Sequence, residues 1–105
     1  MKSVCIFAGS SLGIKEAYKD LAISLGQALV KNNFSMVYGG GGVGLMNEIA
    51  NEVLKYDGEV TGVITERLKD VEAGHKNLTK LYVVKTMHER KAKMAQLSDS
   101  IISLP

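Results

Sequence analysis

The chain has 105 residues, of which 46% are apolar and 23% are charged, a composition ordinary for one small soluble domain spanning residues 1–105. Its formal net charge of +2 does not indicate a nucleic-acid partner, and no run approaches the roughly 20 apolar residues of a membrane span. The single cysteine, Cys5, excludes an internal disulfide and favours a cytoplasmic location.

The N-terminal third predicts a strand followed by a helix. Residues 3–8, SVCIFA, form an uninterrupted apolar run that ends at Gly9, which is typical of a strand covered on both faces. The run is shorter than the apolar core of a signal peptide. Residues 15–31 then have helical spacing, and we expect one face of this helix to be buried: Tyr18, Leu21, Ala22, Leu25, Ala28 and Leu29.

The middle of the chain repeats this order. Residues 34–38, FSMVY, predict a second strand that leads directly into the glycine-rich turn 39–44. The helix expected after this turn has an inner stripe of Leu45, Met46, Ile49, Ala50, Val53 and Leu54. Residues 59–65 predict a third strand, and residues 66–79 are polar and irregular.

The C-terminal third predicts a strand at 80–85, a helix at 87–97 and a fifth, buried strand within 98–105. Strands that alternate with helices predict an α/β, Rossmann-like fold of three layers, with a mostly parallel sheet and helices on both faces. Such sheets bind ligands at the carboxyl ends of their strands, so we expect one cleft there.

The glycine run is the first candidate binding element. Gly39, Gly41 and Gly44 match the pattern G-x-G-x-x-G between a strand and a helix, where glycines let backbone N–H groups approach an anion. The match to a dinucleotide fingerprint is imperfect, because the motif follows the second strand and no acidic residue ends the next one; Glu66 lies just past it. A tight turn without a ligand is therefore the alternative to a phosphate- or ribose-binding turn.

The segment MHERK, at the start of the last predicted helix, is the sharper signal. At about 100° per residue, Met87 and Met94 define an apolar stripe that we expect to be buried, and Arg90 and Lys91 flank it. Arginine offers a bidentate fork for phosphate or carboxylate, and lysine offers a point charge. An anion site and a structural salt bridge are the two alternatives.

Other polar residues give weaker signals. His75 and His88 show no metal-ligand spacing with another His, Cys or carboxylate pair, so we expect no metal site. Ser10 and Ser11 follow the first predicted strand, where they could cap the next helix or donate to a ligand.

Five motifs occur together and in order: FAGSSLG, YGGGGVGLM, GVITERL, the spacing E-x-x-H-x-x-L-T from Glu72 to Thr79, and VVKTMHERKAKM. Together they resemble the LONELY GUY (LOG) family of cytokinin riboside 5′-monophosphate phosphoribohydrolases, whose relatives are often labelled lysine decarboxylase-like. The resemblance covers the whole chain. The glycine run followed by Leu-Met, combined with MHERK, is specific, whereas the glycine turn alone is not.

The resemblance implies an enzyme that hydrolyses the N-glycosidic bond of a nucleoside 5′-monophosphate, AMP or a cytokinin nucleotide, to the free base and ribose 5-phosphate. It implies that Arg90 is catalytic and that Glu72, Arg90 and Lys91 contact the substrate. It further implies that the surrounding wall is formed by Ser10, Gly39, Gly41, Gly44 and Met87. No cofactor is implied, and the assembly implied is a homodimer or a larger homo-oligomer.

In this family the fifth strand is followed by a signature, P-G-G-x-G-T-x-x-E, that holds the phosphate and supplies a catalytic carboxylate. Only its first residue, Pro105, has a counterpart here. We therefore expect a fold truncated after the fifth strand, with that strand at or near an open position of the sheet. We also expect the 105-residue chain to be weakly active or inactive, and to self-associate.

Three other functions were weighed against hydrolysis. A nucleotide-binding or sensing module without turnover is the main alternative, and AMP binding without adenine release would favour it. A NAD-type dehydrogenase is disfavoured by the missing ribose-binding acid. A decarboxylase has no support, because nothing indicates a lysine that carries pyridoxal phosphate.

Overall fold

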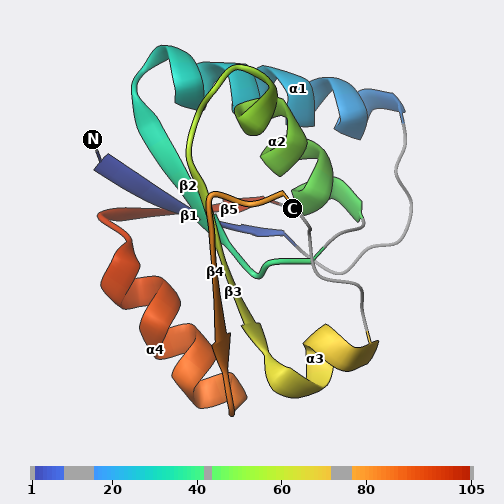
Figure 1. Ribbon diagram of the computed structural model, residues 1–105. Helices are drawn as coiled ribbons and strands as arrows, with labels where there is room; N and C mark the ends of the chain where they lie inside the picture. The colour runs from blue at the N-terminus through green and yellow to red at the C-terminus, as the bar shows by residue number, and fades with distance from the viewer. Residues whose placement is uncertain (1, 9–15, 42–43, 72–76, 105) are drawn as a thin grey trace.

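The computed structural model describes residues 2–8, 16–41, 44–71 and 77–104, and strands and helices alternate along them (Figure 1). In chain order the elements are β1 (Lys2–Ala8), α1 (Glu16–Lys31), β2 (Phe34–Tyr38), α2 (Gly44–Lys55), β3 (Val60–Thr65), α3 (Glu66–Val71), β4 (Lys80–Val84), α4 (Met87–Leu97) and β5 (Ser100–Leu104).

The strands form a five-stranded sheet in the order β4-β3-β2-β1-β5, and all four pairings are parallel. Helices α1 and α2 lie on one face and α4 lies on the other, which gives three layers (Figure 1). The predicted α/β fold with a parallel sheet and helices on both faces is therefore confirmed. The carboxyl ends of β2 and β3 lie side by side in the sheet, which places the glycine run next to the end of β3.

The core consists of two clusters, one on each face of the sheet. On the α1 and α2 side, alternate residues of β1 and β2 pack against the inner stripe of α2, as predicted. The buried residues of this cluster include Val4 and Ile6 of β1, Met36 and Tyr38 of β2, and Ile49, Ala50 and Val53 of α2. On the other side, Cys5, Val37 and Val63 pack under Met94 of α4. Both faces of β1 and β2 are covered at these positions, which explains why apolar residues predominate on both faces of these strands.

The inner face of α1 is narrower than predicted. Ala22 and Leu29 are buried, but Leu21 is 41% exposed and Ala28 is exposed; the side chain of Tyr18 lies outside the described residues. The buried face instead includes Gly26, where α2 packs closely against α1: a Cβ atom on Gly26 would lie 2.7 Å from Cβ of Glu52 in α2.

Residues 66–71 are helical, so the prediction of an irregular segment throughout 66–79 is wrong for this part. Helix α3 starts directly after β3, and Thr65 caps it: the backbone N–H of Leu68 donates to Oγ1 of Thr65 at 3.2 Å. Residues 72–76 lie outside the described residues.

Strand β5 lies at one edge of the sheet, as expected, but it is less buried than predicted. Ile102 packs toward α1 and α2, whereas Ile101 is 60% exposed on the opposite face. Phe7 of β1, on the same face as Ile101, is 40% exposed, because α4 lies mainly over β3 and does not reach β5. Within the described residues, no helix combines the length and the apolarity needed to cross a bilayer.

Candidate nucleotide-binding site

The start of α4 is fixed by its N-cap residue, Thr86. Thr86 has extended backbone (φ −125°, ψ 160°), and its Oγ1 accepts the backbone N–H of Glu89 at 3.0 Å. The Glu89 carboxylate in turn accepts the backbone N–H of Lys85 at 3.4 Å, in a variant of the capping box. The helix therefore begins at Met87, and its first turns present Arg90 and Lys91 at the carboxyl ends of β2 and β3.

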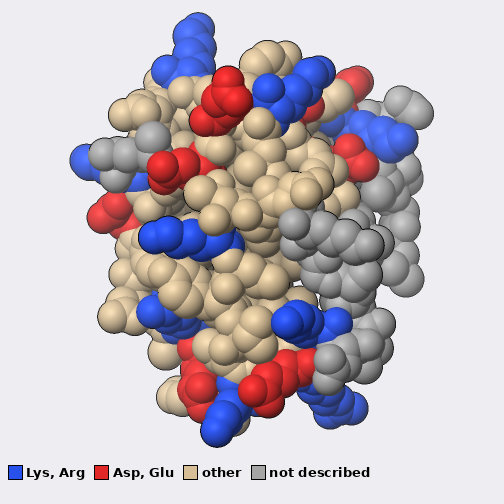
Figure 2. Space-filling model, viewed as in Figure 1, with Lys and Arg blue, Asp and Glu red and all other residues tan. Residues whose placement is uncertain are grey.

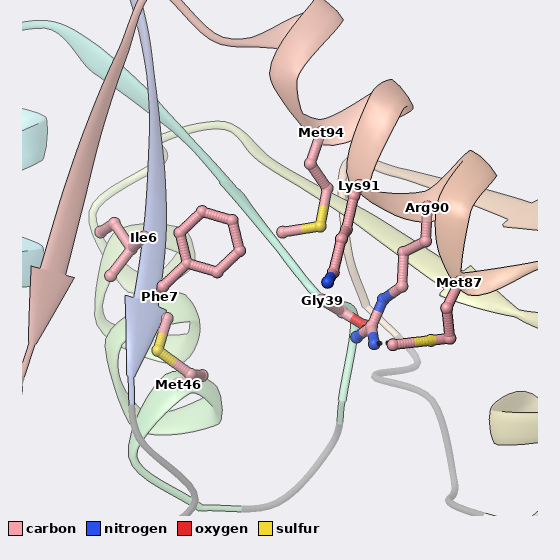
Figure 3. Close-up of a pocket in the computed structure, with 8 residues that line it drawn as sticks. All are labelled: Ile6, Phe7, Gly39, Met46, Met87, Arg90, Lys91 and Met94. Atoms are coloured by element: carbon pink, nitrogen blue, oxygen red, sulfur yellow. Dashed lines mark hydrogen bonds between the residues drawn. The ribbon is translucent and has the colours of Figure 1, made fainter.

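A pocket of about 310 Å³ lies between α4, β1 and the start of the glycine run (Figure 3). Its lining combines two cations with a largely apolar remainder: Ile6, Phe7, Gly39, Met46, Met87, Arg90, Lys91 and Met94. In Figure 3 the Phe7 ring points into the space between β1 and α4, while the Ile6 side chain points to the other side of the strand. One half of the pocket is therefore suited to a flat apolar group and the other to an anion.

The guanidinium of Arg90 is held by two backbone carbonyls, one in β3 and one in the glycine run that follows β2. Its Nε donates to the Val63 carbonyl of β3 at 2.8 Å, and its Nη2 donates to the Gly39 carbonyl at 2.7 Å. Its Nη1 lies 3.8 Å from Sδ of Met87. Arg90 is therefore in direct contact with the glycine run, as a cleft formed by these two motifs requires.

Lys91 is exposed and lines the same pocket. Figure 3 shows its ammonium group directed from α4 toward Gly39, beside the guanidinium of Arg90. An exposed ammonium keeps its charge at little desolvation cost and can exchange water for an anionic ligand.

The first part of the glycine run is fixed from several sides. Gly40 has φ +77°, a backbone conformation that side chains rarely adopt. The hydroxyl of Tyr38 donates to the Gly41 carbonyl at 2.8 Å, and burial raises the pKa of the Tyr38 phenol well above its ordinary value, so this donor stays protonated. The turn thus owes its shape to the end of β2 and to Arg90.

The predicted site residues are only partly brought together. Gly39, Met87, Arg90 and Lys91 line the pocket. The carbonyl of Gly41 accepts the hydroxyl of Tyr38, and Gly41 does not line the pocket. Gly44 is the first residue of α2. Ser10 and Glu72 lie outside the described residues.

Met87 departs from its prediction. The apolar stripe of α4 was expected to bury it, but it is 50% exposed, whereas Met94 is buried. Met87 is the first residue of α4 and lines the pocket, so its side chain faces an open space and not the sheet. Phe7 and Met46 were not predicted as pocket residues; the signal available was their position, at the end of the first strand and just after the glycine run.

The electrostatics of the described lining are one-sided, since Arg90 and Lys91 have no Asp or Glu among the other described lining residues. Over the face shown in Figure 2, basic and acidic side chains are otherwise interspersed. Among the described residues, no group of three or more His, Cys, Asp or Glu is placed to hold a metal ion.

A parallel α/β sheet with a glycine turn and two cations at its carboxyl edge defines a domain of the kind that binds small phosphorylated ligands. Residues 46–105, more than half of the chain, match the model of the family described as "Possible lysine decarboxylase", and the chain belongs to this family.

Comparison with known proteins narrows the resemblance. The chain is 46% identical over 105 residues to the cytokinin riboside 5′-monophosphate phosphoribohydrolase of Rhodococcoides fascians, and 45% identical over 104 residues to LOG1, the enzyme of that name in Arabidopsis thaliana. Each match includes 99% of this chain. The chain spans about half the length of the curated relatives it matches, 53% and 49% for these two.

A solved structure shows the same fold. The molybdenum cofactor carrier protein of Chlamydomonas reinhardtii superposes with a TM-score of 0.80 over 97% of this chain and 61% of its own, at 16% identity. At this identity the likeness concerns the architecture alone.

Proposed function

We propose that this chain binds a nucleoside 5′-monophosphate in the pocket between α4 and the glycine run. The observation that carries the proposal is the position of Lys91 and Arg90 beside Gly39, at the carboxyl ends of neighbouring parallel strands. The phosphate would meet the Lys91 ammonium, and the base would lie against Phe7 and the methionines. The names of the two relatives above support the same class of ligand.

We further propose that the reaction of the family domain is hydrolysis of the N-glycosidic bond, which yields a free base and ribose 5-phosphate. Cleavage of this bond builds positive charge on the sugar, so a carboxylate is needed to stabilise it or to activate water. The Lys91 ammonium would hold the phosphate so that the sugar faces that carboxylate. Glu72, for which a substrate contact was expected, lies outside the described residues.

A nucleotide-binding module without turnover is the second candidate. The observation that favours it is the composition of the described lining, which has two cations and no carboxylate. Such a lining can hold a nucleotide but does not by itself supply the acid–base group that hydrolysis needs.

The binding proposal can be tested by titrating the chain with AMP and with adenosine, using calorimetry and amide chemical shifts. We expect AMP to bind more tightly than adenosine, and Lys91→Gln to remove about tenfold or more of this difference, since one charged hydrogen bond has about that worth. Lys69→Gln, which changes an exposed lysine of α3, is the matched control. The proposal would be contradicted if AMP showed no saturable binding. It would also be contradicted if Lys91→Gln and Lys69→Gln bound AMP with equal affinity.

The reaction is tested separately by following base release from AMP and from an N6-prenylated AMP. Free base and ribose 5-phosphate in equal amounts would support hydrolysis. Saturable binding with no base released would support the binding module instead.

We also propose self-association into a homodimer or a larger homo-oligomer, and a cytoplasmic location. Exposed Phe7 and Ile101, on one face of adjacent strands, support the first. The single cysteine, which is free and buried, supports the second. Light scattering coupled to gel filtration tests the assembly: a monomer at all concentrations would contradict it.

A further inference from the structure

Arg90 connects three elements of the fold through its side chain. It belongs to α4, its Nε donates to β3 at Val63, and its Nη2 donates to the residue that follows β2, Gly39. Both acceptors are backbone carbonyls, and both distances, 2.8 and 2.7 Å, are those of strong hydrogen bonds. Two edges of the guanidinium are therefore used to hold the protein's own backbone.

The glycine at position 39 fits this contact. A Cβ atom built on Gly39 would overlap Nη2 of Arg90, so any larger residue there would displace the guanidinium. The identity of Gly39 is thus explained by Arg90 and not by its own backbone dihedrals, since the positive φ of the described part of the run belongs to Gly40.

The same turn also contacts β3 and Tyr38. A Cβ atom on Gly62 of β3 would lie 2.8 Å from the Cα atom of Gly40, so the turn rests directly on β3. Tyr38 holds the carbonyl of Gly41. Arg90 completes this arrangement on the pocket side, where a bound ligand would meet the turn.

We propose that Arg90 is a positioning residue, which acts on the bound nucleotide through the glycine turn, while Lys91 is the cation that contacts the nucleotide directly. The inference deepens the proposed function and rests on it. It differs from the direct catalytic role that the family resemblance implied for Arg90. The guanidinium fork is what this role requires, because a carbonyl of β3 and a carbonyl of the glycine run must be bridged at once.

The decisive comparison is between charge and geometry. Arg90→Lys keeps the positive charge but has one nitrogen in place of a fork, whereas Arg90→Gln loses both. If Arg90 positions the turn, we expect both variants to lose AMP affinity to a similar extent, within about threefold of each other and about tenfold or more below the native chain. If Arg90→Lys retains native affinity while Arg90→Gln loses it, the charge acts directly and the proposal is overturned.

Gly39→Ala gives an independent route to the same perturbation, because it displaces the guanidinium without changing Arg90. We expect Gly39→Ala to weaken AMP binding as much as Arg90→Gln does. In the double variant, Gly39→Ala should lower AMP affinity by less than about a further twofold, since both changes break the same interaction. Fully additive losses would overturn the proposal. Should Arg90→Gln not fold, Gly39→Ala and Arg90→Lys carry the comparison.

Amide hydrogen exchange separates this inference from the proposed function. In the ligand-free chain, Arg90→Lys and Gly39→Ala should speed exchange at Gly40 and Gly41 about tenfold or more relative to α1, and Arg67→Gln, an exposed arginine of α3, should not. Unchanged exchange at the turn would overturn the positioning role whatever the ligand. If these variants show the faster exchange but the native chain does not bind AMP, the contact between Arg90 and the glycine turn is supported and the proposed function is refuted.

Discussion

Replacing Gly62 by alanine tests how tightly the glycine turn rests on β3. The added Cβ atom would meet Cδ1 of Leu78 at 2.6 Å and Cδ1 of Leu81 at 3.1 Å, and these flexible side-chain ends can move away at little cost. It would also meet Cα of Gly40 at 2.8 Å, and backbone held by hydrogen bonds cannot move away so easily. The turn must therefore shift, or β3 must.

The expected magnitude is the difference between two effects. Overpacking of this kind destabilises a protein by about 1–3 kcal/mol. Alanine also restricts the unfolded chain, which stabilises by about 0.4–1 kcal/mol. The net loss in the free energy of unfolding is about 1.5 kcal/mol, and with a urea m-value of about 2 kcal/mol/M the midpoint falls by about 0.7 M.

Urea unfolding followed by circular dichroism measures this change. The matched control is Gly41→Ala, because among the described residues nothing beyond its chain neighbours lies within 4 Å of a Cβ atom there, and Gly41 does not have a positive φ. The control should unfold at or above the native midpoint. If Gly62→Ala unfolds at the same urea concentration as Gly41→Ala, the turn does not rest on β3 in the way that the geometry indicates.

Three further predictions concern the surroundings of the site. Thr86→Ala removes the cap of α4 and should lower the free energy of unfolding by about 1 kcal/mol, measured by urea unfolding; an unchanged midpoint would show that Glu89 N–H needs no acceptor. Met94→Ala, at a buried position under α4, should cost about 2–5 kcal/mol and also widen the pocket, which weakened AMP binding would report. The pKa of Tyr38 is higher in the folded chain than in the unfolded chain. Its contribution to the free energy of unfolding is therefore complete below about pH 10, and it declines above that pH by up to about 1.4 kcal/mol per pH unit. Tyr38→Phe should therefore reduce the loss of stability between pH 9 and pH 11, whereas Tyr56→Phe, at an exposed tyrosine, should leave it unchanged.

Much of the fold could be predicted because local patterns specify it. Strands β2 and β3 begin and end at the predicted residues or within one of them, and α4 has the predicted bounds. Helix α3 was missed because six residues carry too little periodicity to stand out. Its one local signal was Thr65 before Glu66, a capping residue followed by an acidic first turn.

The sequence predicted which motifs lie close together at the site, but not which of their atoms are in contact. A helical wheel places Arg90 and Lys91 beside the Met94 stripe, but it does not say which part of α4 the sheet covers. In the structure Met87 is half exposed, and the guanidinium of Arg90 reaches two carbonyls. The distances that commit Arg90 to Val63 and Gly39 depend on the packing of three elements, which a single sequence does not display.

The pairing of β1 with β5 has a consequence for folding during translation. Ser3 is hydrogen-bonded to Asp99, 96 residues later, and the strands that follow them pair along their length. The ribosome makes β1 first and needs about 5–20 s to reach β5 at typical elongation rates. Throughout that interval one side of β1 presents unpaired backbone, so the emerging chain is most open to chaperones, and to other nascent chains, along the strand that it makes first.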